Sequence, residues 1–378
     1  MISENKNRII FLDLLRAFAV LMMVQGHTID TFLGDQYRTF DSVVYDVWFT
    51  IRGFTAPIFM FTSGVTFTYL LLSSSKPFKE NPRVSKGVRR FVILVLIGYL
   101  LRFPTHLVFD FREVTHLQWI TFFTVDALHL IGFGLLFILA LAYLTERFKL
   151  NYYLTFLFGA LFFFFFFLVS DKINWANYLP IPFAAYLYHG TGSYFPFFPW
   201  AGYVLSGAIL GIYLARNPLV FNSKNFSLNL LMFSALFLVI CFAIHMLEDY
   251  LYGSKTFWTD NLALLFYRTG IILLLNSAMS YIALKLKLIP DLIKQVGKNT
   301  LLVYVVHVII LYGSIWIPGF GMFYAKTLNI PLSILAAIVL IVTMFGMVSL
   351  FERLKNYRNK KLVPVKMNQS GEVREAKI

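Results

Sequence analysis

Residues 9–29 read IIFLDLLRAFAVLMMVQGHTI, an apolar run long enough to cross a lipid bilayer as one helix. A bilayer core about 30 Å thick needs about 20 such residues per helix. Further runs of this kind follow along the chain, at roughly 46–73, 90–109, 117–144, 152–170, 198–215, 228–247, 261–284, 299–317 and 329–351. Because the runs are continuous rather than alternating, they favour helices over barrel strands. The sequence therefore predicts an all-α, polytopic membrane helix bundle with about ten spanning helices.

The composition supports a chain made almost wholly of membrane helices. Of 378 residues, 58% are hydrophobic and 14% are charged, whereas soluble domains average about 45–50% and about 25%. We predict one transmembrane domain over 1–352 and a basic, polar tail over 353–378 that is disordered. The first run contains Asp13 and Arg16 and lacks a cleavage pattern, so we do not expect a signal peptide. A single cysteine, Cys241, excludes an intramolecular disulfide and a cysteine metal cluster.

The net charge of +14 is unevenly distributed along the chain. Of the 33 Lys and Arg residues, 24 fall in one alternating set of connections and termini, and five in the other set. This asymmetry predicts that both termini lie in the cytoplasm, which requires an even number of spanning helices. The excess of basic residues is thus explained by membrane topology and by attraction to anionic lipid, and we expect no nucleic-acid partner. We expect an integral, multi-pass protein of the plasma (inner) membrane, and a homodimer is compatible with the sequence.

The first run contains ionisable side chains, which cost at least about 2.5–3.5 kcal/mol each inside a membrane. Arg16 and His27 are eleven residues apart, which places them on one helix face and about 16 Å apart along the axis. Asp13 can pair with Arg16 near the inner end, and Asp30 can orient the imidazole of His27 near the outer end. This stripe suits a reaction whose substrates arrive from opposite sides, although spacing alone is equally compatible with a packing role.

Five more polar residues fall within or beside other apolar runs. They are Arg102, Asp126, His129, Arg268 and His307. Taken singly, each is more easily explained as a structural partner, but together they predict a polar cavity within the bundle. The arginines need a carboxylate, a carbonyl oxygen or an anionic substrate. No HxxxH or HExxH spacing supports a metal site.

Several motifs resemble one family. The segment 11–27, FLDLLRAFAVLMMVQGH, resembles the first helix of the transmembrane acyltransferases, a superfamily related to the acyltransferase-3 family, in which an Arg, ten residues and a His form the hallmark. Four further segments resemble the bacterial branch related to heparan-α-glucosaminide N-acetyltransferase, also called DUF1624. They are TAPIFMFTSG at 55–64, DALHLIG at 126–132, FPFFPWAGY at 195–203 and VGKNTLLVYVVH at 296–307. The resemblance thus covers roughly residues 8–317.

The resemblance implies an enzyme that transfers an acetyl or other short acyl group, to oxygen or to nitrogen. The donor would be cytoplasmic acetyl-CoA or another acyl-CoA, used as a co-substrate with no tightly bound cofactor. The acceptor would be an extracytoplasmic saccharide or glycolipid. His27 matches the catalytic histidine, which can act as general base or as nucleophile. Arg16 matches the motif arginine and can hold the donor.

The remaining site residues take supporting roles in this interpretation. We assign Asp30 to the catalytic group beside His27. Donor contacts are assigned to Arg16, Arg102, Arg268 and His307. The other cavity residues are Asp13, Asp126 and His129. Two alternatives remain open: a proton-coupled secondary transporter, because buried His and Asp also form proton relays, and a catalytically silent membrane component.

Overall fold

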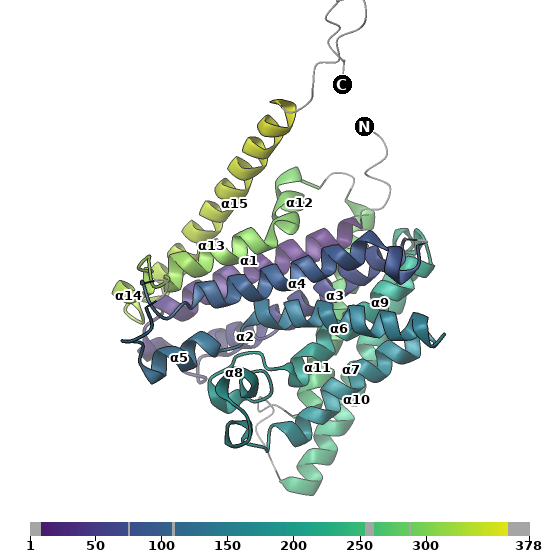
Figure 1. The fold of residues 1–378 in the computed structure, drawn as a ribbon, viewed down its shortest axis with the longest axis horizontal. Helices are drawn as coiled ribbons and strands as arrows, with labels where there is room; N and C mark the ends of the chain where they lie inside the picture. Colours follow the sequence, from purple (N-terminus) through teal and green to yellow (C-terminus); the bar gives the residue numbers. More distant parts are fainter. Residues whose placement is uncertain (1–8, 75, 108–109, 254–260, 287–288, 362–378) are drawn as a thin grey trace, which may run out of the picture.

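The computed structural model describes residues 9–74, 76–107, 110–253, 261–286 and 289–361 (Figure 1). Regular structure in these ranges is helical, and β pairing is limited to two isolated bridges. The helices are α1 (Ile10–Phe32), α2 (Val43–Arg52), α3 (Thr55–Leu72), α4 (Pro82–Leu101), α5 (His116–Phe123), α6 (Ala127–Arg147), α7 (Tyr152–Ser170), α8 (Ile181–Ala184), α9 (Phe197–Arg216), α10 (Lys224–Tyr252), α11 (Leu262–Lys285), α12 (Asp291–Lys298), α13 (Thr300–Tyr312), α14 (Gly321–Tyr324) and α15 (Ile330–Lys361). The predicted all-α class is confirmed.

Eight segments of the described chain are long and apolar enough to cross a membrane. They are α1, the α2–α3 segment Val43–Leu72, α6, α7, α9, α10, α11 and α15. The pair α12–α13 makes a ninth candidate, but it is bent by 77° at the break around Asn299. The third predicted span, 90–109, corresponds to α4, which is not among these candidate spans. The first half of α4 contains four basic residues, Arg83, Lys86, Arg89 and Arg90. The protein is thus a multi-pass membrane protein, with eight or nine candidate spans among the described residues.

Two predicted elements have different boundaries in the structure. The predicted span 117–144 is interrupted between α5 and α6, because Asp126 is the N-cap of α6 and accepts hydrogen bonds from its first turn. Asp126 therefore lies just before α6, whereas we had predicted Asp126 and His129 within one helix. At the other end of the chain, α15 continues to Lys361, so the predicted tail begins inside a helix; residues 362–378 lie outside the described ranges.

The central helix pair α3–α9 packs with backbones in close approach. A Cβ atom at Gly64 would collide with the backbone of Val204, and one at Gly207 with the backbone of Phe61. Small residues at such crossings are typical of membrane helix packing. Around this pair, α7 packs on α9, α4 on α6 and α10 on α11, while α1 contacts α3, α11, α12, α13 and α15 (Figure 1). This arrangement places α1 and its polar stripe inside the bundle.

Candidate active site

Two histidines meet where α1 lies against α13. Nδ1 of His27 is 3.0 Å from Nε2 of His307, and the two rings stack with centroids 5.2 Å apart. His307 is completely buried, and its Nδ1 is 2.8 Å from the backbone oxygen of Val303. His27 retains partial exposure. The sequence placed both residues in one cavity, and the structure shows them in direct contact.

The hydrogen bonds of this pair define the proton positions in the neutral rings. A carbonyl oxygen can only accept, so Nδ1 of His307 donates to Val303. Nε2 of a neutral His307 is then an acceptor, and Nδ1 of His27 must donate to it. The lone pair of His27 consequently lies on Nε2, which has no hydrogen-bond partner within the described ranges. This is the protonation state that a general base or a nucleophilic imidazole requires.

Asp30 lies one turn beyond His27 and has other partners than the one predicted. Its carboxylate forms ion pairs with Arg52 of α2 and with Arg38, whose Nη1 is 3.3 Å from Oδ1. The Arg52 guanidinium also lies over the rings of Trp48 and Phe49. Asp30 therefore pairs with two arginines at the carboxyl-terminal end of α1, and His307 occupies the place beside His27 that we had assigned to Asp30.

The amino-terminal end of the α1 stripe lies where α12 and α13 meet. Nη2 of Arg16 donates to Oγ1 of Thr300, the first residue of α13, over 3.2 Å. Asp13 is buried, and its backbone oxygen approaches Gly297 so closely that a Cβ atom there would collide with it. Arg16 and His27 thus both contact α13. The Asp13–Arg16 pair stays a prediction.

A second polar cluster surrounds the start of α6. Oδ1 of Asp126 accepts from the backbone N–H of Leu128 at 2.9 Å and lies 2.8 Å from Nδ1 of His129. Oδ2 of Asp126 is 3.7 Å from Nη2 of Arg102, which follows α4. Asp126 and His129 are buried, and Gly98 of α4 leaves room for the imidazole, because a Cβ atom there would overlap it. The cluster joins α4 to α6.

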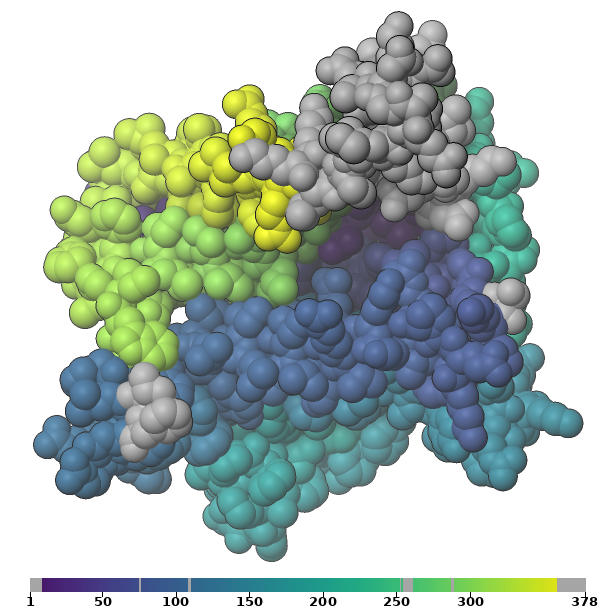
Figure 2. All heavy atoms as spheres, turned by 45° about the horizontal axis from the view of Figure 1, so that its top comes forward, coloured from purple at the N-terminus to yellow at the C-terminus, as the bar shows by residue number. Residues whose placement is uncertain are grey.

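Two tyrosines of α13 lie against the histidine pair. The ring centre of Tyr304 is 5.6 Å from that of His307, and the ring centre of Tyr312 is 5.8 Å from that of His27. In Figure 2, dark purple atoms from the start of the chain are recessed between α4 in blue and α13 in green. A polar cavity that joins this group to the Asp126 cluster stays a prediction.

Arg268 belongs to α11 and contacts α9. Its guanidinium is 5.1 Å from the centre of the indole ring of Trp200, a cation–π contact within the bundle. Our sequence reading did not select Arg52, Thr300, Tyr304 or Tyr312. A signal existed only for Arg52, a permanent charge within a predicted span that must find a partner; hydroxyls in apolar runs give no comparable signal.

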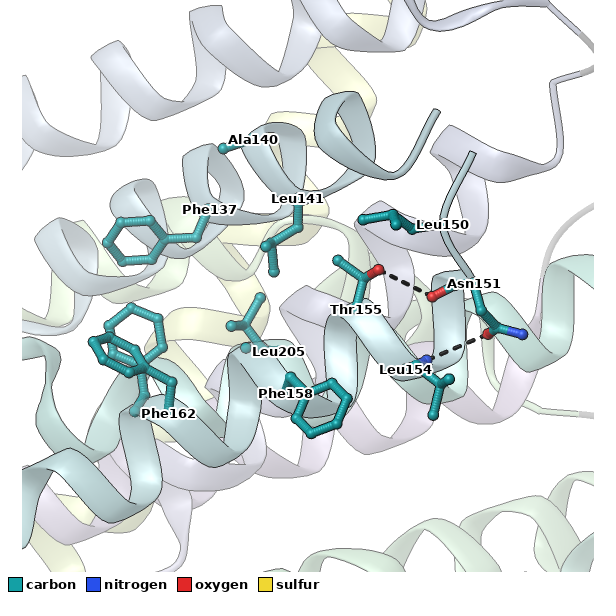
Figure 3. A pocket seen from close by; sticks show the side chains of 12 residues that line it. Phe137, Ala140, Leu141, Leu150, Asn151, Leu154, Thr155, Phe158, Phe162 and Leu205 are labelled. Atoms are coloured by element: carbon teal, nitrogen blue, oxygen red, sulfur yellow. Dashed lines mark hydrogen bonds between the residues drawn. The ribbon is translucent and has the colours of Figure 1, made fainter. Parts of the chain in front are cut away.

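An apolar recess of about 650 Å³ lies between α6, α7 and α9 and has no ionisable side chain in its lining (Figure 3). Its polar atoms are used locally: the Asn151 side chain caps α7 and Thr155 donates to the Asn151 backbone oxygen. This recess cannot neutralise a charged donor. Among the described residues, no group of three or more His, Cys, Asp or Glu side chains is placed to hold a metal ion.

The capping role of Asp126 leads to a stability prediction. Asp126→Ala should be less stable than Asp126→Asn by about 1 kcal/mol, because asparagine keeps an oxygen that can cap α6. Both variants should be less stable than the wild type, since Arg102 loses its carboxylate. Thermal unfolding in detergent measures this order, with the exposed Asp171→Ala as a control that leaves the unfolding temperature unchanged. Wild-type stability of Asp126→Ala would contradict the assigned role.

A family model built from known proteins covers about the first two thirds of the chain. The family model described as heparan-α-glucosaminide N-acetyltransferase, catalytic, matches residues 8–254. No curated protein and no solved structure gives a significant match. The matched region contains α1, with Arg16 and His27, and the Arg102–Asp126–His129 cluster. Thr300 and His307, the contacts of the α1 stripe on α13, lie beyond it.

Proposed function

The chain belongs to the heparan-α-glucosaminide N-acetyltransferase catalytic family, and from this premise we propose that it moves an acetyl group across the membrane. The family implies an acetyltransferase that uses acetyl-CoA. In our proposal the donor binds on the cytoplasmic side and the acceptor is a saccharide or glycolipid on the outer side. The observation that supports this best is the His27–His307 hydrogen bond, which leaves an accessible histidine with a basic Nε2 inside the bundle.

Two chemical routes to acetyl transfer can use Nε2 of His27. As a general base, Nε2 of His27 takes the proton of an acceptor amine or hydroxyl while that group attacks the thioester carbon and the CoA thiolate leaves. As a nucleophile, Nε2 attacks the thioester carbon itself and releases the CoA thiolate. The acceptor then attacks the acetyl carbon, the bond from that carbon to Nε2 breaks, and the freed Nε2 takes up the proton that the acceptor loses. In both routes His307 is a positioning residue that keeps the proton of His27 on Nδ1.

We propose that Arg16 holds the donor. It lies about 16 Å along α1 from His27, at the end where α12 and α13 meet. The pantetheine arm of CoA separates the phosphates from the thioester, so one donor molecule can contact both residues. Arg102 pairs with Asp126 at 3.7 Å, and we propose that it assists the donor or the acceptor.

The topology that fits this reaction has ten crossings, with α4 as the tenth. The 20 residues of α4 extend over about 30 Å, the thickness of a bilayer core, and the helix lies along α6. With α4 included, the start of α1 and the end of α15 lie on one side, which we propose is the cytoplasm. We further propose one transmembrane domain over residues 1–352 and a location in the plasma membrane.

The function is tested by donor turnover. Protein in nanodiscs receives radiolabelled acetyl-CoA with a panel of amino sugars and cell-envelope glycans, and we expect label on an acceptor. Protein in liposomes, loaded with the same acceptors, should place the label on acceptors on the side opposite to acetyl-CoA. Absence of any acetyl transfer in well-folded protein, together with uptake of an unmodified substrate, would favour the transporter instead.

Arg16 provides a separate test of the donor site. Arg16→Gln should raise the KM for acetyl-CoA by about tenfold or more, because a hydrogen bond to a charged group contributes about 1.5–3 kcal/mol. The kcat should fall less, since the residue lies far from His27. Arg16→Lys keeps the charge and should recover part of the affinity. An unchanged KM in Arg16→Gln would remove this residue from the donor site.

A further inference from the structure

A second apolar cavity, of about 600 Å³, separates two helix pairs. On one side α7 packs on α9, and on the other α10 packs on α11. Its lining is almost entirely Phe, Leu, Ile and Tyr, with Ser206, Asn229 and Thr269 as the polar exceptions. Lining residues of α7 and α10 are also exposed, among them Phe165 at 43% and Phe233 at 56%. The cavity therefore opens toward lipid between α7 and α10.

The cavity runs along the helix axes. From its Tyr153 end, its lining on α7 extends to Phe165, which is about 18 Å. Its lining on α11, from Leu262 to Leu273, lies toward the other end, because α10 and α11 are antiparallel and Ser234 of α10 is level with Gly270 of α11. The cavity is therefore longer than half of a bilayer core, about 15 Å, and has room for an extended hydrocarbon chain.

One end of the cavity is positively charged. Tyr153 and Tyr213 line it there, and the guanidinium of Arg216 lies 5.0 Å from the ring centre of Tyr153 and 5.4 Å from that of Tyr152. Arg216 is exposed and has no carboxylate partner within the described ranges. Lys224, at the start of α10, is also exposed and precedes the lining residue Phe226 by two positions.

We propose that this cavity binds one anionic phospholipid. Its acyl chain lies between the pairs α7–α9 and α10–α11, and its phosphate contacts Arg216 and Lys224. The apolar lining and the length select a hydrocarbon chain, and the two cations select a negatively charged headgroup over a zwitterionic one. This lipid lies beside the helices of the reaction cavity and does not depend on acetyl transfer.

Native mass spectrometry of the full chain tests this proposal. Protein in detergent is titrated with phosphatidylglycerol or with phosphatidylcholine of the same acyl chains. We expect one retained phosphatidylglycerol, bound at least tenfold more tightly than phosphatidylcholine. The double variant Arg216→Gln/Lys224→Gln should abolish this preference, whereas Arg353→Gln/Lys355→Gln on α15, which removes the same charge, should keep it.

A second variant tests the cavity itself. Ser206→Phe fills space between the helix pairs and should prevent retention of either lipid. Equal retention of both lipids by the wild type would overturn the proposal, as would a phosphatidylglycerol preference unaffected by the Arg216/Lys224 double variant. If Ser206→Phe does not fold, the two charge variants decide the question, because surface substitutions of this kind leave the core unchanged.

Discussion

Replacement of His27 by alanine should lower the rate of acetyl transfer by about 10²–10⁴-fold, the range that a positioned acid–base group contributes. The lone pair on Nε2 is what the reaction uses, and alanine supplies no substitute for it. The KM for acetyl-CoA should change little, because the donor phosphates are assigned to Arg16. Steady-state kinetics with the best acceptor of the panel gives both constants.

A histidine elsewhere in the chain provides the matched control. His245 of α10 interacts with Asp249 and lies outside both polar clusters, so His245→Ala should keep the wild-type rate. Protein incubated with labelled acetyl-CoA alone then separates the two routes: label on wild-type protein that is lost in His27→Ala indicates the nucleophile, and no label indicates the base. A rate in His27→Ala equal to wild type would overturn the assignment of His27.

Replacement of His307 by leucine should lower kcat by about 10–10²-fold, the effect expected when the group that orients a reactive imidazole is removed. Leucine cannot accept from Nδ1 of His27, so the proton is no longer held there and the lone pair moves between the two ring nitrogens. His307→Gln keeps an acceptor oxygen near the position of Nε2 and should recover part of kcat. The KM values should stay close to those of the wild type in both variants.

This pattern separates positioning from folding. A purely structural role would lower the unfolding temperature in step with activity and would give no advantage to glutamine. Equal kcat values for His307→Leu and His307→Gln at wild-type stability would therefore contradict the positioning role. Stability is measured by thermal unfolding of the same detergent preparations.

The sequence was sufficient for features that depend on local pattern. Continuous apolar runs predicted the helices of the candidate spans, and the eleven-residue spacing placed Arg16 and His27 on one face of α1, where both contact α13. The partners were not predictable. Asp30 was assigned to His27 because it was the nearest carboxylate in sequence, yet Arg52 and Arg38 reach it from other elements. Partner choice depends on tertiary packing, which spacing along one helix cannot report.

The interruptions were also missed, for a related reason. Asp126 lies within an apolar run that looks continuous, but its side chain can bond to backbone N–H groups and so favours a helix start. The break between α12 and α13 differs, because Asn299 is the predicted start of the run 299–317; there the Asn299 amide donates to the carboxylate of Glu352 on α15 at 2.8 Å. Hydropathy is averaged over many residues and does not register a single capping position such as Asp126.

The bend before α13 affects the electrostatics around Arg16. With 13 residues, α13 extends over only about 20 Å and falls short of a full bilayer core. Its amino terminus lies beside Arg16, because Arg16 donates a hydrogen bond to Thr300, the first residue of α13. No side chain caps this terminus. The aligned peptide dipoles give that terminus roughly half a positive elementary charge. In the proposed donor site, part of the attraction for the phosphates would thus come from the main chain, and substitution of Arg16 would not remove it.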